Sequence, residues 1–137
     1  MNEAVRRELV FPQSREVVWN AIASREALAA WMYPNDFEAR LGHQFTFQVP
    51  AKPEVGFEGL TVACEVIVCA PPAELAFTWV AGGIDTVVRY RLESGEGVTI
   101  LHFEQTGFTP SQQHARMGAE YGWRMMHEAL QALVSPT

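Results

Sequence analysis

Residues 109–134 read TPSQQHARMGAEYGWRMMHEALQALV, and this stretch predicts one long helix at the end of the chain. Thr109 can accept hydrogen bonds from free N–H groups at the helix start, and Pro110 has the φ angle of a first helical residue. Gln112 can reach back to close a capping box. No comparable breaker follows until Ser135-Pro136. A helix from Pro110 to Val134 is roughly 37 Å long at 1.5 Å per residue, which is enough to lie across a whole sheet.

One face of this helix changes from small to large residues along its length. At about 100° per residue, that face carries Ala115, Gly118, Ala119, Gly122, Met126, Leu130 and Leu133, with Trp123, Met125 and Ala129 beside it. Two mid-helix glycines cost about 1 kcal/mol each relative to alanine, so we expect something to offset that cost. Either the small residues leave room for an apolar ligand against the sheet, or bulky sheet side chains fill the same room.

The opposite face of the helix is polar. It carries Glu120, Arg124, His127, Glu128 and Gln131. Solvated side chains are the ordinary occupants of such a face, so we expect His127 to be exposed to water. Glu120 and Arg124 are four residues apart, and this spacing favours an ion pair.

The rest of the chain predicts one strand, two short helices and then a series of strands. The first strand covers residues 3–11, and Ser14 and Ser24 are each placed to cap a short helix. The further strands are expected at residues 36–40, 44–49, 57–69, 75–79, 84–93 and 98–106. This order predicts an α+β fold of the helix-grip type, in which a curved antiparallel sheet of about six to seven strands wraps around the long terminal helix.

Length, composition and charge narrow the functional classes. The 137 residues, 48% of them apolar, predict a single domain over residues 1–137. The net charge is −6 and the basic residues are scattered, which argues against binding to nucleic acid or to an anionic membrane. The sequence has no apolar segment of signal-peptide or membrane-spanning length, so we expect a soluble cytoplasmic protein. Cys64 and Cys69 are expected to be reduced thiols on opposite strand faces.

Several stretches carry a resemblance to a known family. They are Val18-Trp19-Asn20-Ala21-Ile22, Leu28-Ala29-Ala30-Trp31, residues 35–47 (NDFEARLGHQFTF), Cys64-Glu65-Val66, Pro71-Pro72, residues 75–79 and 99–101, Thr106-Gly107-Phe108, and Gly122-Trp123. In this order the sequence resembles the START-like or birch-pollen-allergen-like (SRPBCC) superfamily, and within it the family named for the activator of the heat-shock protein 90 ATPase. The resemblance implies the helix-grip fold. It also implies two kinds of activity seen in relatives: holding a lipid, hormone or polyketide between helix and sheet, and stimulating the chaperone ATPase.

The aromatic residues are the strongest functional signal. Phe45, Phe47, Phe77, Trp79, Tyr90 and Phe103 all fall on strand positions that can face the helix. They can form the core, or they can line an apolar pocket in which Trp79 and Tyr90 orient a ligand through their polar tips. Both hold if one end of the sheet is packed and the end near the helix start is open. The candidate ligand-binding residues are therefore Trp31, Phe45, Phe47, Trp79, Tyr90, Phe103, Ala119, Gly122, Trp123 and Met126.

Catalytic and metal-binding signals are weaker. His102 and Glu104 are two apart on a strand, the spacing of a base and an orienting carboxylate, although such a pair commonly faces solvent. Glu65 interrupts an apolar run, and it either faces inward with Arg89 or Arg91 as a partner, or faces outward in a cross-strand ion pair. The four histidines have no metal-ligand spacing, and we expect neither a metal nor a cofactor.

The sequence supports three functional hypotheses. The leading one is a module that binds an apolar or aromatic small molecule between the sheet and the terminal helix. The second is a cyclase-like or hydratase-like enzyme acting in the same cavity through Glu65, His102 or Glu104. The third, which rests on the resemblance, is a domain with a chaperone partner. Exposed sheet edges permit self-association, but the sequence selects no oligomeric state.

Overall fold

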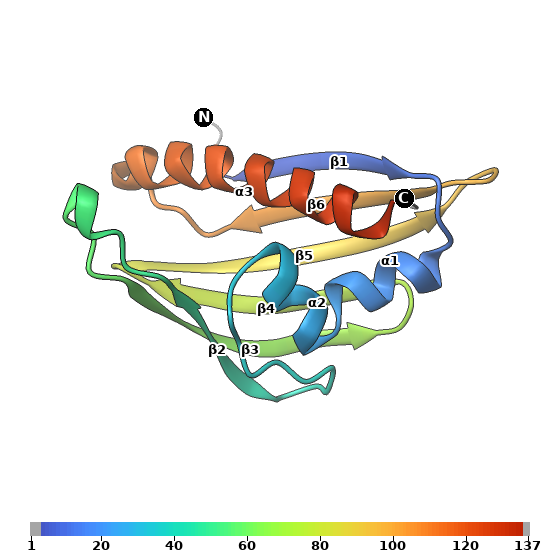
Figure 1. The fold of residues 1–137 in the computed structure, drawn as a ribbon, viewed down its shortest axis with the longest axis horizontal. Coiled ribbons are helices and arrows are strands. Elements are labelled where there is room, and N and C mark those ends of the chain that lie inside the picture. Colours follow the sequence, from blue (N-terminus) through green and yellow to red (C-terminus); the bar gives the residue numbers. More distant parts are fainter. Residues whose placement is uncertain (1–3, 136–137) are drawn as a thin grey trace.

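The computed structural model describes residues 4–135, and Figure 1 shows a curved sheet with the α-helices on one side. The chain begins with one strand and two short helices, continues with five strands and ends with the long helix. The elements are β1 (Val5–Phe11), α1 (Arg15–Ile22), α2 (Arg25–Trp31), β2 (Gln44–Val49), η1 (Pro53–Val55), β3 (Leu60–Ala70), β4 (Glu74–Ala81), β5 (Ile84–Ser94), β6 (Thr99–Thr106), η2 (Pro110–Gln112) and α3 (Gln113–Val134). η1 and η2 are single turns of 3₁₀ helix.

The strands form one antiparallel sheet in the order β1-β6-β5-β4-β3-β2. Alternate residues of each strand face the helices, as in β6, where Thr99, Leu101, Phe103 and Gln105 are buried. This arrangement confirms the predicted α+β helix-grip fold. The sheet forms one wall of the core and the three helices form the other.

Residues 36–40 are not a strand, so the sheet has six strands within residues 4–135. Asn35 makes only an isolated bridge to Phe47 at the edge of β2. The Asp36 carboxylate accepts a hydrogen bond from the Thr46 backbone N–H at 2.7 Å. Because a side chain takes the place of a backbone acceptor here, the segment lies along the sheet edge without extending the ladder.

The predicted helix starts are confirmed. Ser14 Oγ accepts a hydrogen bond from the Val17 N–H, and Ser24 Oγ accepts one from the Ala27 N–H, each at 3.3 Å. At the long helix, the Thr109 N–H donates to Gln112 Oε1 at 2.9 Å. The first turn after Thr109 is 3₁₀, and the α-helix proper begins at Gln113.

The rotation of α3 about its axis differs from the sequence prediction. The fully buried residues of α3 are Trp123, His127 and Leu130. The prediction that His127 faces solvent was wrong, since its side chain is 0% exposed. By contrast, Ala115 and Gly118 are exposed although they were placed on the inner face. The helix is therefore turned so that His127, and not the row of small residues, lies at the centre of the buried stripe.

This rotation also changes the expected ion pair on α3. Glu120 pairs with Arg116 at 2.9 Å, one turn before it, rather than with Arg124. Arg124 instead lies over the Tyr121 ring, with its guanidinium carbon 5.3 Å from the ring centre.

The connection from β6 to α3 passes very close to the β4–β5 hairpin. Gly107 has a φ of +114°, and a Cβ atom at this position would lie 2.8 Å from the backbone oxygen of Asp85. Glycine is therefore required here by both conformation and space. Just beyond it, Gln112 Nε2 donates a hydrogen bond to the Gly83 backbone oxygen at 3.0 Å. These two contacts fix the start of the long helix relative to the hairpin.

Candidate functional site

The first half of α3 leaves open space beside the sheet. A Cβ atom added at Gly118 or at Gly122 would meet no heavy atom within 4 Å, apart from the helix backbone and chain neighbours. Gly118 is exposed, whereas Gly122 is half-buried. The space at Gly122 therefore lies on the side of the helix that turns toward the protein.

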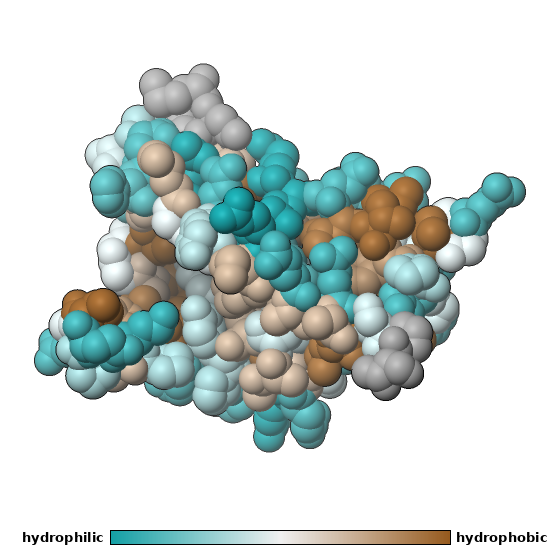
Figure 2. Space-filling view, turned by 45° about the horizontal axis from the view of Figure 1, so that its top comes forward, coloured by the Kyte–Doolittle hydropathy of each residue, from teal (hydrophilic) through white to brown (hydrophobic). Residues whose placement is uncertain are grey.

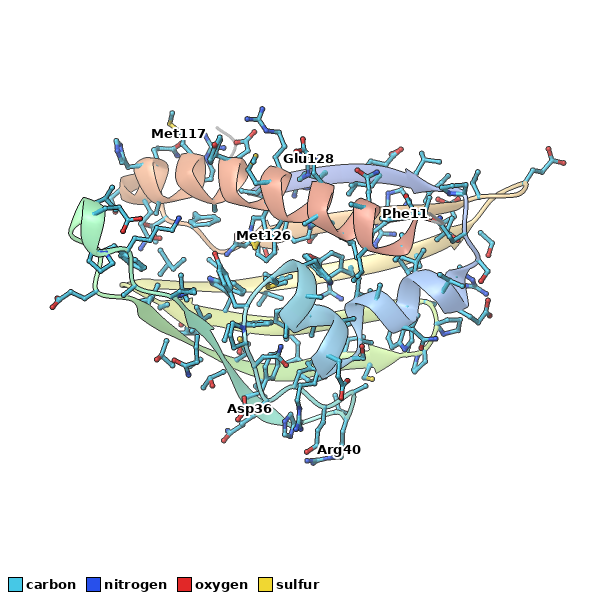
Figure 3. All side chains as sticks on the ribbon, viewed as in Figure 1. Phe11, Asp36, Arg40, Met117, Met126 and Glu128 are labelled. Carbon is cyan, nitrogen blue, oxygen red and sulfur yellow. The ribbon has the colours of Figure 1, made fainter. Side chains whose placement is uncertain are left out.

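Four of the ten predicted ligand-binding residues are half-buried and not fully buried. Ala119, Gly122 and Met126 lie along one flank of α3, at helical spacings of three and four residues, and Trp79 lies on the inner face of β4, in ring contact with Trp123 of the same helix. Figure 3 shows Met126 pointing from α3 toward the sheet, whereas Met117 points away from it. Figure 2 shows the surface hollowed between the beginning of α3 and the η1 loop, with apolar residues on its floor. We call this hollow the α3 cleft.

The other six predicted residues lie in the packed core. Each is no more than 3% exposed: Trp31, Phe45, Phe47, Tyr90, Phe103 and Trp123. Neighbouring rings are in contact, with centroids 5.4 Å apart for Phe45 and Phe47 and 4.8 Å apart for Phe103 and Trp123. Trp79 connects this core to the cleft, because its ring lies 5.2 Å from that of Trp123. The core end of the sheet is packed, and the end near the helix start is open.

A buried series of hydrogen bonds links the Trp123 indole to the backbone of Trp79. Trp123 Nε1 donates to Gln105 Oε1 at 2.7 Å, and Gln105 Nε2 donates to Thr86 Oγ1 at 2.9 Å. Thr86 Oγ1 in turn donates to the Trp79 backbone oxygen at 2.9 Å. Gln105 and Thr86 are each 1% exposed, so breaking any link leaves an unpaired polar group in the core. Sequence reasoning missed this chain, although Gln105 continues the inward alternation of Leu101 and Phe103.

A second buried chain lies under the centre of α3 and was also missed. Arg7 faces inward from β1, and its Nε donates to His127 Nδ1 at 3.1 Å. An arginine nitrogen can only donate, so Nδ1 must be the acceptor and the imidazole is neutral with its proton on Nε2. That Nε2–H donates to the Tyr90 hydroxyl oxygen at 3.0 Å. Since Trp123, His127 and Leu130 share one helix face, the positions of Trp123 and Leu130 were a signal that His127 is buried.

Burial determines the charge states of the hydrogen-bonded side chains His127 and Tyr90. Burial lowers the pKa of His127 to about 3, and the positive charge of Arg7 acts in the same direction. Burial also raises the pKa of Tyr90 well above its ordinary value, although the charge of Arg7 partly opposes this. Both groups are neutral near pH 7, and the Arg7 guanidinium supplies the charge of the chain.

The three catalytic candidates lie on the outer face of the sheet. His102 and Glu104 point away from the helices, and His102 Nε2 lies 2.9 Å from Glu93 Oε1. Glu65 is exposed on β3 and lines a hollow of about 470 Å³ on that outer face. The sheet itself therefore separates all three from the α3 cleft.

Within residues 4–135 the structure contains no metal-binding cluster, no disulfide and no membrane-spanning helix. No three histidine, cysteine, aspartate or glutamate side chains in this range are grouped as a metal site would require. Cys64 and Cys69 are both free thiols, and burial raises the pKa of each. No helix in the described range combines the length and apolar character needed to cross a bilayer.

Solved structures of other proteins share this architecture. MLL2253 from Mesorhizobium loti is 30% identical, with a TM-score of 0.85 and 96% of each chain covered. BH1534 from Bacillus halodurans is 25% identical, with a TM-score of 0.80 and 96% of each chain covered. CV1439 from Chromobacterium violaceum, at 19% identity and a TM-score of 0.84 over the whole of both chains, shares the fold.

Sequence comparison gives the family. A search of curated proteins finds no match. Residues 12–135 match the family described as "Activator of Hsp90 ATPase homolog 1-like protein". This match covers α1 through α3 and includes every residue that borders the α3 cleft. Together with the fold and the similarity to the Mesorhizobium protein, it shows that this chain belongs to the family of activator of Hsp90 ATPase homolog 1-like proteins.

Proposed function

We propose that this protein is a single-domain cytoplasmic module that binds an apolar or aromatic small molecule in the α3 cleft. The ligand would lie between Trp79 on β4 and the flank of α3 formed by Ala119, Gly122 and Met126. The observation that carries the proposal is the open space at Gly122, on a helix that is otherwise held against a packed core.

The chemistry of the cleft supports an apolar ligand. Its partly exposed wall residues are apolar or aromatic, and the nearby Ala81 and Ile84 on the β4–β5 hairpin are also partly buried against the core. Burying such surface against a ligand contributes about 25 cal/mol per Å². The Trp79 ring offers a flat surface for stacking and an indole N–H that can orient a polar tip.

The rigid back wall of the cleft also supports binding. The chain through Gln105 and Thr86 connects the Trp123 indole to the Trp79 backbone, so the Trp123 ring does not need to be ordered when a ligand arrives. A preformed wall lowers the entropic cost of association.

Gly122→Leu tests this proposal directly. Since the added side chain enters open space in a regular helix, the fold should be kept and helix propensity should improve by up to about 1 kcal/mol. The leucine would occupy the cleft, so binding of the neutral fluorescent probe N-phenyl-1-naphthylamine should be lost. Native mass spectrometry of the purified wild-type protein should find a retained small molecule that the variant lacks.

Gly118→Leu is the matched control, one helical turn earlier. It introduces the same side chain on an exposed position, and it should leave probe binding unchanged. Equal probe affinity in wild type and in a folded Gly122→Leu variant would rule out the α3 cleft as the site.

A chaperone-partner function is the second candidate, and the family match favours it. A pull-down with the bacterial Hsp90 homologue, followed by measurement of its ATPase rate, distinguishes it from ligand binding. Stimulation that persists in Gly122→Leu would assign the chaperone contact to a surface other than the cleft. If the protein neither retains the chaperone nor changes its ATPase rate, this candidate is excluded.

An enzyme working in the cleft through Glu65, His102 or Glu104 has no support from the geometry. All three side chains lie on the opposite face of the sheet, and the sheet backbone stands between them and Trp79. A general base must come within hydrogen-bond reach of the proton that it removes.

A further inference from the structure

A second groove runs along the other flank of α3. It lies between β1 and the first half of the helix, has a volume of about 410 Å³, and is lined by Arg7, Met117, Glu120, Tyr121 and Arg124. On a helical wheel, Glu120 and Arg124 project from the flank opposite to that of Ala119 and Gly122. This groove, which we call the β1–α3 groove, is therefore distinct from the α3 cleft, and a ligand can bind in it whether or not the cleft is occupied.

Arg7 is held in place at the base of this groove. Its neighbours at alternate positions of β1, Val5 and Leu9, are buried, so its side chain starts from the core side of the strand. The hydrogen bond from Nε to the buried His127 fixes the plane of the guanidinium. Within residues 4–135 no hydrogen bond or ion pair involves the two terminal nitrogens of Arg7, and Arg7 lines the groove together with Glu120 and Arg124.

The charge of Arg7 has no counterion within residues 4–135. The ion pairs in this range join other residues, and the partner of Arg7 is a neutral imidazole. A half-buried charge that lacks an opposite charge is unfavourable, and an anion bound beside it removes that cost. A guanidinium fork fits a carboxylate or a phosphate in particular, because it offers parallel N–H groups to two oxygens.

The remaining walls of the groove add a second cation and an apolar surface. Arg124 is packed over the Tyr121 ring, which limits its freedom. Glu120 is the one carboxylate in the lining, and Arg116 already pairs with it at 2.9 Å. Met117 and Tyr121 are 60% and 61% exposed. The lining therefore combines two arginines with an uncovered apolar wall.

We propose that the β1–α3 groove binds a small amphipathic anion, with its carboxylate or phosphate between Arg7 and Arg124 and its apolar body against Met117 and Tyr121. The anion supplies the counterion that Arg7 lacks within residues 4–135. The rigid hydrogen bond to His127 means that Arg7 does not have to be ordered on binding, which favours affinity.

Isothermal titration calorimetry with octanoate, octyl phosphate and octan-1-ol tests this inference on the whole chain. Both anions should bind to the wild type, more weakly as salt is added, and at least about tenfold more tightly than the alcohol, as a charge-assisted pair implies. The stronger of the two anions identifies the head group. In Gly122→Leu, whose α3 cleft is filled, octan-1-ol binding as tightly as both anions would overturn the proposal.

Three arginine variants locate the site. Arg7→Gln should weaken binding of the better anion about tenfold or more. Arg6→Gln is the matched control, since Arg6 is the exposed neighbour on the other face of β1, and it should bind as the wild type does. Because Arg7 also contacts His127, circular dichroism must show that Arg7→Gln is folded. Arg124→Glu, a charge reversal at an exposed position, provides the same test without touching the core and should also lower affinity about tenfold.

The same titration separates this groove from the α3 cleft. Gly122→Leu fills the cleft but lies on the opposite flank of the helix, so it should leave octanoate and octyl phosphate binding unchanged. Loss of anion binding in Gly122→Leu, or full retention of it in Arg124→Glu, would overturn the groove assignment. Neither outcome bears on uptake of the neutral probe, which tests the cleft alone.

Discussion

The two halves of α3 differ in how deeply their residues are buried. From Trp123 onward, the helix buries Trp123, His127 and Leu130 and closes the core against the sheet, α1 and α2. From Gln113 to Gly122, the same helix has no fully buried residue, and two of its positions face open space. Both flanks of this first half border hollows, the α3 cleft on one side and the β1–α3 groove on the other.

One helix can therefore stabilise the core with one half and leave open space beside the other half. Apolar burial and the two buried hydrogen-bond chains are concentrated beneath the second half, and they hold the helix in place. The first half is then positioned by continuity with the second and by the hydrogen bond from Gln112 to the β4–β5 hairpin. A site next to it can remain open without loosening the fold.

The largest expected effect on stability comes from removing the buried Trp123 side chain in the second half of α3. Trp123→Ala should lower the free energy of unfolding by about 3–5 kcal/mol, because it leaves a cavity and takes the hydrogen-bond partner from the buried Gln105. Urea denaturation followed by circular dichroism measures this. Tyr121→Ala, two residues earlier and 61% exposed, is the control and should cost less than about 1 kcal/mol. Similar losses in both variants would contradict the contrast between the two halves.

A smaller effect should appear in acid. The folded-state pKa of His127 is lowered to about 3, whereas the unfolded chain has the ordinary histidine value of about 6.5. Between these values the unfolded state binds the proton and the native state does not. The contribution of His127 is therefore complete above pH 6.5 and decreases as the pH falls, by about 3 kcal/mol between pH 6.5 and pH 4.

His127→Gln isolates this contribution, because glutamine does not titrate. The stability advantage of the wild type over His127→Gln should shrink by about 3 kcal/mol over that pH range. A stability difference that stays constant over this pH range would mean that the buried imidazole is not the group that resists protonation.

The smallest expected effect on stability comes from a substitution in the first half of α3. Gly118→Ala should raise the free energy of unfolding by about 0.5–1 kcal/mol, since the new Cβ meets open space and alanine favours the helix. Thermal denaturation measures the gain. The reverse change in the second half, Ala129→Gly at an exposed position, should cost a similar amount. A loss of stability in Gly118→Ala would indicate that the first half is packed more closely than its surface shows.

The fold was predictable because its signals are local. Ser14, Ser24 and Thr109 mark helix starts, and alternating apolar residues mark the strands. The exception was residues 36–40, where Asp36 caps the Thr46 backbone instead of continuing a ladder. That choice depends on a contact ten residues away, which a local pattern does not contain.

The site was predictable only in part, because the rotation of α3 depends on distant partners. His127 lies between Arg124 and Glu128 in the sequence, and it was therefore assigned to the polar face of the helix. Its burial is made possible by Arg7 and Tyr90, which are 120 and 37 residues away. These partners satisfy both ring nitrogens of His127. Without knowledge of the sheet register, the row of small residues was the more plausible inner face. Of that row, Ala119 and Gly122 lie half-buried on one flank of the helix, whereas Ala115 and Gly118 are exposed.

The close passage at Gly107 sets how near the start of α3 lies to the β4–β5 hairpin. With an Asp85 backbone atom within 3 Å of where a Cβ would be, any side chain at position 107 pushes the outgoing chain away from the hairpin, and the start of the long helix moves with it. The position of the helix start thus depends on the absence of a side chain at residue 107. A substitution at this one junction would shift the flank that carries Ala119 and Gly122 without altering any residue on it.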